Sequence, residues 1–143
     1  MSVLWIAPTV ARAESLNFLP LHLDAMNPSP SQGWGQRERG GLMERANADG
    51  LLALALVHHL AIAKNVPLDD VVQWLLGLSS TGVIEFVPKE DSMVGVLLSN
   101  REDIFASYDK VTFEQHLMRH ARIVRQETVS RSGRVLYWYQ SLA

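Results

Sequence analysis

The sequence predicts an α/β domain with a mostly parallel sheet, which is parallel in its middle and antiparallel at its C-terminal end. A continuous apolar run at residues 51–57 is typical of a parallel strand buried on both faces. A short β-branched segment, residues 81–88, follows a helical stripe, which predicts a strand–helix–strand unit. Segments 123–129 and 134–139 flank a Ser-Gly turn, which predicts a terminal hairpin. We therefore expect three layers, with helices on both faces of the sheet.

Composition is compatible with a single domain over residues 1–143. The chain is 48% apolar with a formal net charge of -2 and no cysteine, which excludes a disulfide scaffold, a thiolate metal site and a cysteine nucleophile. The balanced charge argues against a nucleic-acid-binding protein. No basic start precedes the first apolar residues, and no run approaches the ~20 apolar residues that a membrane span needs. We expect a soluble, cytoplasmic protein without a membrane partner.

The N-terminal third predicts little regular structure. Residues 10–15 read as the end of a short helix, and residues 17–24 alternate as a strand in which Pro20 permits only edge or partial pairing. Residues 27–35 are rich in Pro, Ser, Gly and Asn, which predicts a loop. Residues 36–45 predict a short exposed helix that two consecutive glycines weaken.

The middle of the chain predicts the strand–helix–strand unit. Leu and Ala favour a helix at residues 51–57, but a separate helix begins near Pro67 and ends near Gly77, so we assign the run to a strand. The apolar stripe of that helix has helical spacing and comprises Leu68, Val71, Val72, Leu75 and Leu76. The next strand, residues 81–88, ends at Pro88.

Two helices and the hairpin complete the prediction. The first helix covers residues 93–98. The second begins with a capping box, in which Thr112 caps the free amides and Gln115 reaches back, and it ends near His120. In the hairpin turn, Gly133 occupies the position that most needs a positive φ.

Polar residues follow the predicted strands where a ligand crevice would lie, at the strands' carboxyl ends. His58 or His59 could act as a general base, because an imidazole titrates near physiological pH. Neighbouring strand residues face opposite ways, so at most one of them faces a ligand; alternatively one packs and the other is solvated. Glu85 lies inside an apolar strand and needs a partner, either His59, Lys89 or an arginine, in a structural or a catalytic role.

Two further patterns have simpler interpretations. His116 and His120 have the spacing of a helical metal pair, but the glutamate of a zinc peptidase and a third ligand are missing, so a solvated helix face is favoured and no metal is expected. Five arginines near the C-terminal aromatic residues could bind RNA, but charges on edge strands also prevent self-pairing, and we favour that interpretation. These arginines are Arg119, Arg122, Arg125, Arg131 and Arg134.

The order of elements and their strand-end residues resembles the second half of a class I S-adenosylmethionine (SAM)-dependent methyltransferase. More closely, the chain resembles a bacterial group related to host-specific nodulation proteins. The resemblance spans about residues 16–139, and its blocks are residues 24–30, 33–34, 53–62, 65–68, 84–91, 101–105 and 134–137.

The resemblance implies a partial Rossmann-like sheet that lacks its first two strands and the glycine-rich loop that holds the methionine part of the cofactor. It implies that Asp24, with Ala25, contacts the adenine of SAM and that His58 or His59 lies near the methyl acceptor, which stays unidentified. A loop-capping role for Asp24 is the alternative. Half a pocket predicts weak or absent cofactor binding and an inactive or partial enzyme.

A non-catalytic interaction module is the rival interpretation. An open sheet edge exposes unpaired backbone groups, so we expect a homodimer or a partner chain that completes the sheet. Insertion of residues 18–24 beside the 51–57 strand would satisfy the same edge.

Overall fold

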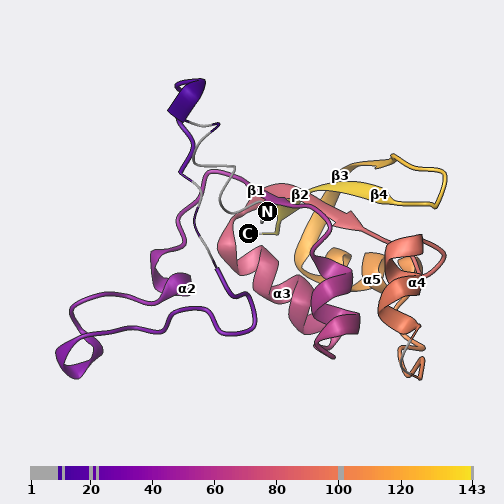
Figure 1. The fold of residues 1–143 in the computed structure, drawn as a ribbon, viewed down its shortest axis with the longest axis horizontal. Coiled ribbons are helices and arrows are strands. Elements are labelled where there is room, and N and C mark those ends of the chain that lie inside the picture. The colour runs from indigo at the N-terminus through magenta and orange to yellow at the C-terminus, as the bar shows by residue number, and fades with distance from the viewer. Residues whose placement is uncertain (1–9, 11, 20, 22, 100–101, 143) are drawn as a thin grey trace.

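The fold is a four-stranded sheet packed on helices, seen in a computed structural model that describes residues 10, 12–19, 21, 23–99 and 102–142 (Figure 1). The strand order is β1-β2-β4-β3. The strands are β1 (Leu51–Ala53), β2 (Thr81–Phe86), β3 (Ala121–Thr128) and β4 (Val135–Ser141). The helices are α2 (Leu42–Arg45), α3 (Leu68–Leu78), α4 (Ser92–Leu98) and α5 (Lys110–His120), with a 3₁₀ turn, η1 (Trp34–Gln36), and a π-helical turn, η2 (His59–Ala63).

The sheet is mixed, and the expectation of a mostly parallel sheet is wrong. Only β1 and β2 run parallel, joined by η2 and α3, whereas β2–β4 and β4–β3 are antiparallel. The terminal hairpin is confirmed, and it sets this balance because its second strand lies between β2 and β3. Gly133 in the hairpin turn has a φ of 87°, as its position predicted.

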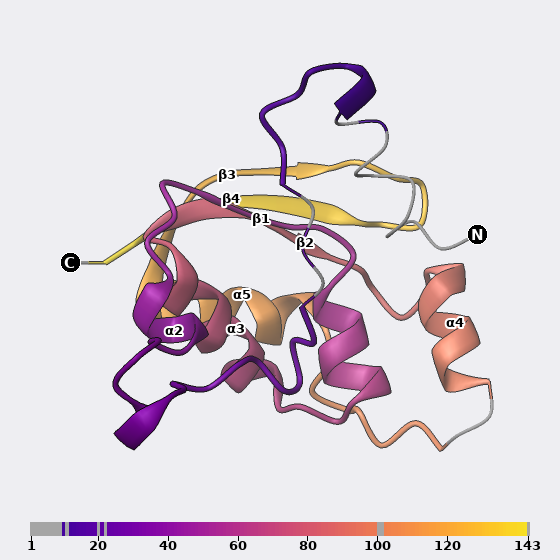
Figure 2. The same cartoon turned by 60° about the vertical axis from the view of Figure 1, so that its left-hand side comes forward.

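The fold has two layers, so the expectation of three is wrong. Figure 2 shows α3, α4 and α5 together on one side of the sheet. The side chains that face these helices are buried, among them Ile84, Phe86, Tyr137 and Tyr139. On the opposite face Leu52 is 73% exposed and Trp138 is 48% exposed. The described helices longer than one turn lie on the other side of the sheet and leave this face uncovered.

The central buried strand predicted at residues 51–57 is wrong in length and place. β1 covers only three residues and lies at the edge of the sheet. The chain turns at Ala55, whose φ is 52°, and becomes helical from Val57 into η2. The Leu- and Ala-rich composition favoured a helix over this run, but only Val57 at its end is helical. At Gly82 a Cβ would lie 2.4 Å from the Leu51 carbonyl oxygen, so this glycine permits the close β1–β2 approach.

The strand predicted at residues 17–24 is wrong over its described residues, which carry no strand. Phe18, Leu19 and Leu21 are exposed there, so their alternation buries no face. Pro20 and His22 lie outside the described residues. The helix predicted at 36–45 is reduced to α2 and the η1 turn, whereas residues 10, 12 and 13 are helical as predicted.

The three longer helices follow the sequence prediction. In α3 the residues Leu68, Val71, Val72 and Leu75 of the predicted stripe are buried. The predicted capping box is wrong, because α5 begins earlier and its N-cap is Asp109, whose carboxylate accepts the Thr112 N–H at 2.9 Å. No helix among the described residues is long and apolar enough to cross a lipid bilayer.

An aromatic row forms the centre of the core between the sheet and α5. Phe86 lies 5.1 Å from both Tyr108 and Phe113, and Phe113 lies 5.2 Å from Tyr137, measured between ring centroids. Each buried tyrosine hydroxyl has a partner: Tyr108 donates to the Val87 carbonyl and Tyr137 donates to Glu114. The row fixes the position of β2, which carries Glu85 near its carboxyl end.

Candidate functional site

An open pocket beside η2 brings together three residues that the sequence singled out. Asp24 and Ala25 come from the N-terminal loop, and His59 comes from the first residue of η2. The pocket has a volume of about 370 Å³. Its lining is Leu23, Asp24, Ala25, Met26, Leu56, His59, Leu60, Ala63 and Lys64. The mixture of apolar walls with a few polar groups is typical of a small-molecule site, at the lower end of the usual size range.

Asp24 also has the loop-capping role that the sequence offered as an alternative. Its Oδ1 accepts the Met26 N–H at 2.9 Å, and its backbone carbonyl accepts the Asn27 N–H at 3.1 Å. This Asx turn orients the exposed carboxylate at the mouth of the pocket. Because a carboxylate accepts several hydrogen bonds, the turn leaves Asp24 able to accept one from a ligand.

His58 and His59 face different environments, although they lie in a helical segment and not at the end of a strand as predicted. His58 is 1% exposed, whereas His59 is exposed and borders the pocket. Burial lowers the pKa of His58 to about 4, with the nearby His59 and Arg134 acting in the same direction. His58 is therefore neutral near pH 7, and its Nδ1 is buried without a hydrogen-bond partner among the described residues. Of the two, His59 is placed where a ligand could reach it.

Glu85 is buried at the carboxyl end of β2. The structure shows which of the partners considered for it, His59, Lys89 or an arginine, it contacts. Its Oε2 accepts the Ala55 N–H at 2.6 Å, and its Oε1 lies 3.5 Å from Arg134 Nη1. The partner is thus an arginine together with a backbone amide. Glu85 does not line the open pocket; it holds the turn that leads from β1 to the two histidines.

Asp91 completes a buried ionic cluster with Arg134. Arg134 donates from Nε and Nη2 to the two Asp91 oxygens at 2.7 and 2.9 Å, and Ser132 donates to the same carboxylate. Asp91 is also the N-cap of α4, since it accepts the Met93 N–H at 3.0 Å. The hydrogen bonds from Arg134 and Ser132 hold the pKa of Asp91 well below its usual range, so the carboxylate is ionised near pH 7.

Sequence reasoning missed Asp91, Ser132 and the role of Arg134. The sequence places Arg134 among five arginines near the C-terminal aromatic residues, where a surface role is the simpler interpretation. The sequence does contain one indication of this pair. A glutamate inside an apolar strand needs a charged or hydrogen-bonding partner, and Arg134 immediately precedes a strand rich in tyrosine. Recognising the pair requires the β2–β4 register, in which Phe86 faces Val135.

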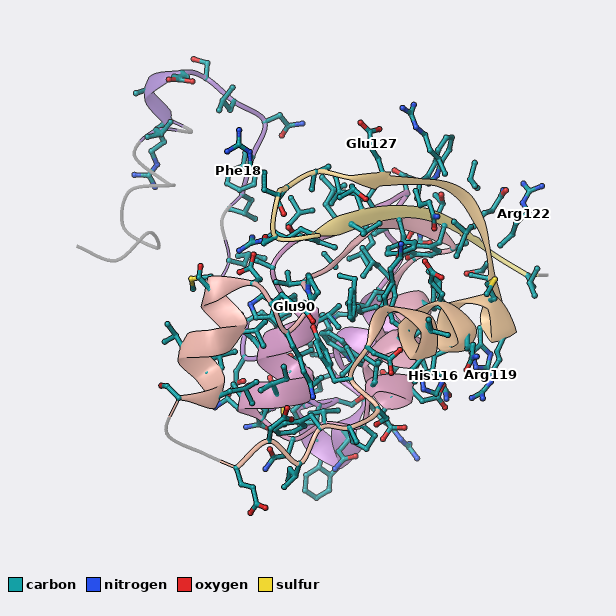
Figure 3. All side chains as sticks on the ribbon, turned by 90° about the vertical axis from the view of Figure 1, so that its right-hand side faces the viewer. Phe18, Glu90, His116, Arg119, Arg122 and Glu127 are labelled. Atoms are coloured by element: carbon teal, nitrogen blue, oxygen red, sulfur yellow. The ribbon has the colours of Figure 1, made fainter. Side chains whose placement is uncertain are left out.

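His116 belongs to a different surface. Figure 3 shows His116 and Arg119 on the side of α5 away from the sheet, while Glu127 projects from β3 on the opposite side of the molecule. His116 Nδ1 lies 2.8 Å from the Asp69 carboxylate of α3, so it joins two helices. His120 lines a separate hollow with Arg119. Within the described part of the chain, no three His, Cys, Asp or Glu side chains gather as a metal site.

The fold and the pocket together define a class: an α/β domain with a mixed sheet and a small-molecule-sized pocket beside the carboxyl end of its parallel pair. The chain is similar to the nodulation protein NoeA of Rhizobium meliloti (strain 1021), with 54% identity over 126 residues. The match covers 88% of this chain, and the chain spans 26% of the length of NoeA. This similarity supports the bacterial, nodulation-related part of the resemblance. No protein-family model matches the chain, and no solved structure matches it.

Proposed function

We propose that this chain is part of a SAM-dependent methyltransferase-like domain whose open pocket takes the adenosine end of the cofactor. A single observation carries the proposal: Asp24 and Ala25 line one pocket together with His59, which is distant from them in sequence. These are the residues that the methyltransferase resemblance assigned to cofactor and acceptor. The mixed sheet with its parallel β1–β2 pair and terminal antiparallel hairpin is compatible with the same proposal.

The residues of the pocket fit the adenosine end of the cofactor. The volume of about 370 Å³ suits a nucleoside better than a whole SAM molecule. Asp24 would accept a hydrogen bond from the exocyclic amine of adenine, and the small side chain of Ala25 leaves room for the ring. Leu56 and Leu60 supply apolar walls. When bound, SAM supplies a methyl group attached to a positively charged sulfur.

His59 is the group of this chain that would serve the acceptor. Its imidazole is exposed at the pocket and could take up the proton that an acceptor hydroxyl or amine loses as it is methylated. His58 lies behind it as a neutral, buried ring, 4.3 Å away between ring centroids. Its part in the proposal is to support His59, and the part of Glu85 is to hold the turn before both histidines.

Calorimetric titration of the chain with S-adenosylhomocysteine tests the proposal. We expect a dissociation constant of about 10 μM to 1 mM, because the glycine-rich half of a cofactor site is missing from the described residues. Asp24→Ala should weaken binding at least about tenfold, equivalent to ~1.4 kcal/mol. Asp49→Ala removes another exposed acid and is the matched control. Absence of heat at millimolar ligand would reject the proposal.

A second candidate, an assembly module, is favoured by the edge of the sheet. β1 pairs with β2 on one side, and no described strand pairs with its other side. Leu52 and Leu54 beside that edge are 73% and 55% exposed. We propose that a second copy of the chain, or a partner chain, pairs with this edge if the titration detects no cofactor.

A further inference from the structure

Arg134 joins three segments that are distant in sequence. It follows the hairpin turn, and its guanidinium contacts Glu85 at the end of β2 and Asp91 at the start of α4. The Glu85 and Asp91 side chains are only 10% and 5% exposed. This ion pair differs from an exposed surface pair, which contributes little to stability. Removing one partner would leave the other charge buried, and that costs free energy of folding.

The contact between Glu85 and Ala55 extends this cluster to the turn before η2. Ala55 has a φ of 52°, a left-handed conformation that costs free energy for a residue with a Cβ. Its N–H donates to Glu85 Oε2 at 2.6 Å. The turn therefore depends on a carboxylate, and the other oxygen of that carboxylate faces Arg134.

We propose that Arg134 is a positioning residue: its guanidinium fixes the Glu85 carboxylate, which holds the Ala55 turn and thereby sets where Leu56 and His59 meet the pocket. In naming His59 as the group that is positioned, the inference rests on the proposed function. Arginine suits this task because its planar fork binds Asp91 with two nitrogens while the third faces Glu85. The single ammonium of lysine cannot reproduce that geometry.

Amide hydrogen exchange by NMR on the full chain tests the inference without any ligand. In Arg134→Gln the Ala55 amide should exchange at least about tenfold faster than in the unmodified chain, while the Val72 amide inside α3 should change less than about threefold. Arg125→Gln is the matched control. It makes the same change on the same hairpin, but the Arg125 side chain is 72% exposed and its ion pair is with Glu127.

Arg134→Lys keeps the experiment decisive if Arg134→Gln does not fold. It retains the positive charge, so the fold should survive, yet Ala55 exchange should still rise at least about threefold because the bidentate geometry is lost. Equal acceleration at Ala55 and Val72 in a folded variant would show a general loss of stability and overturn the inference. Unchanged exchange at Ala55 in both variants would overturn it as well.

Titration with S-adenosylhomocysteine in the same variants separates this inference from the proposed function. We expect Arg134→Gln, or Arg134→Lys in its place, to weaken binding at least about fivefold and Arg125→Gln to leave it unchanged. If the unmodified chain binds nothing but Ala55 exchange responds to Arg134, the turn is positioned as inferred and the proposed cofactor site fails. If binding occurs and Ala55 exchange is indifferent to Arg134, the proposed function stands and the positioning inference fails.

Discussion

His58 and His59 are adjacent, and their ring centroids lie 4.3 Å apart, yet His58 is buried and His59 is exposed. The difference arises because residues 57–58 are already helical and lead into η2, so successive side chains turn about the helix axis. The His58 imidazole is buried, and the His59 imidazole borders the pocket. The two adjacent rings therefore differ in their exposure to solvent and to a ligand.

The buried state of His58 predicts a loss of stability on mild acidification. Its pKa is lowered from 6.5 to about 4, so below pH 6.5 the unfolded chain binds a proton that the folded chain does not. The free energy of unfolding should therefore fall as pH drops from about 6.5 to about 4, by up to about 3 kcal/mol from this residue. Urea denaturation between pH 7 and pH 4.5 measures this slope.

Paired histidine variants isolate the source of that slope. His58→Asn removes the titrating group and should flatten the dependence between pH 6.5 and 5, whatever its cost at pH 7. His59→Asn, on the exposed neighbour, should preserve most of the dependence, because burial is the largest cause of the lowered His58 pKa. An unchanged slope in His58→Asn would assign the effect to other groups.

Two helix N-caps, Asp91 and Asp109, offer a matched measurement of the Arg134 ion pair. Each carboxylate accepts a backbone N–H of its own helix, but only Asp91 also binds Arg134. Asp109→Ala should cost about 1 kcal/mol through the lost cap. Asp91→Ala should cost about 3 kcal/mol or more, because it also removes both hydrogen bonds from Arg134 and leaves that partly buried guanidinium with only the longer contact to Glu85 among the described residues. Equal losses in chemical denaturation would mean that the ion pair contributes nothing net.

The aromatic row predicts where truncation of a core side chain destabilises the fold most. Phe113 is fully buried between Phe86 and Tyr137, so Phe113→Ala should lower the free energy of unfolding by about 3–5 kcal/mol. Phe18 is 60% exposed, and Phe18→Ala should change that free energy by less than about 0.5 kcal/mol. Thermal denaturation of both variants checks the contrast; a small effect at Phe113 would contradict the central position of the row.

The open β1 edge predicts self-association if the assembly proposal holds. Sedimentation at increasing concentration should then reveal a dimer, and Leu52→Lys should weaken it at least about tenfold by placing a charge beside the edge strand. Trp34→Ser is the control, since Trp34 is 89% exposed but lies on η1, outside the sheet. A monomer at all concentrations, or equal weakening by both substitutions, would argue against pairing at β1.

Part of the candidate site could be read from sequence. The predicted strand ends singled out His59, the family resemblance singled out Asp24, and the position of Glu85 inside an apolar strand indicated that it needs a partner. The identity of that partner could not be read, because Arg134 reaches Glu85 only when β4 pairs with β2 in the observed register. The strand predicted at residues 17–24 is absent from its described residues, because an alternating pattern does not by itself provide a neighbouring strand for pairing.

The sequence by itself determined the elements that local chemistry controls. The apolar stripe of α3 and the glycine of the hairpin turn specify their conformations within a few residues. Tertiary structure decided the rest: the three-residue length of β1, its place at the edge, and the insertion of β4 beside β2. The physical reason is that strand order and ionic partners depend on contacts between distant segments, whose free energy is gained only after the chain has closed the loops between them.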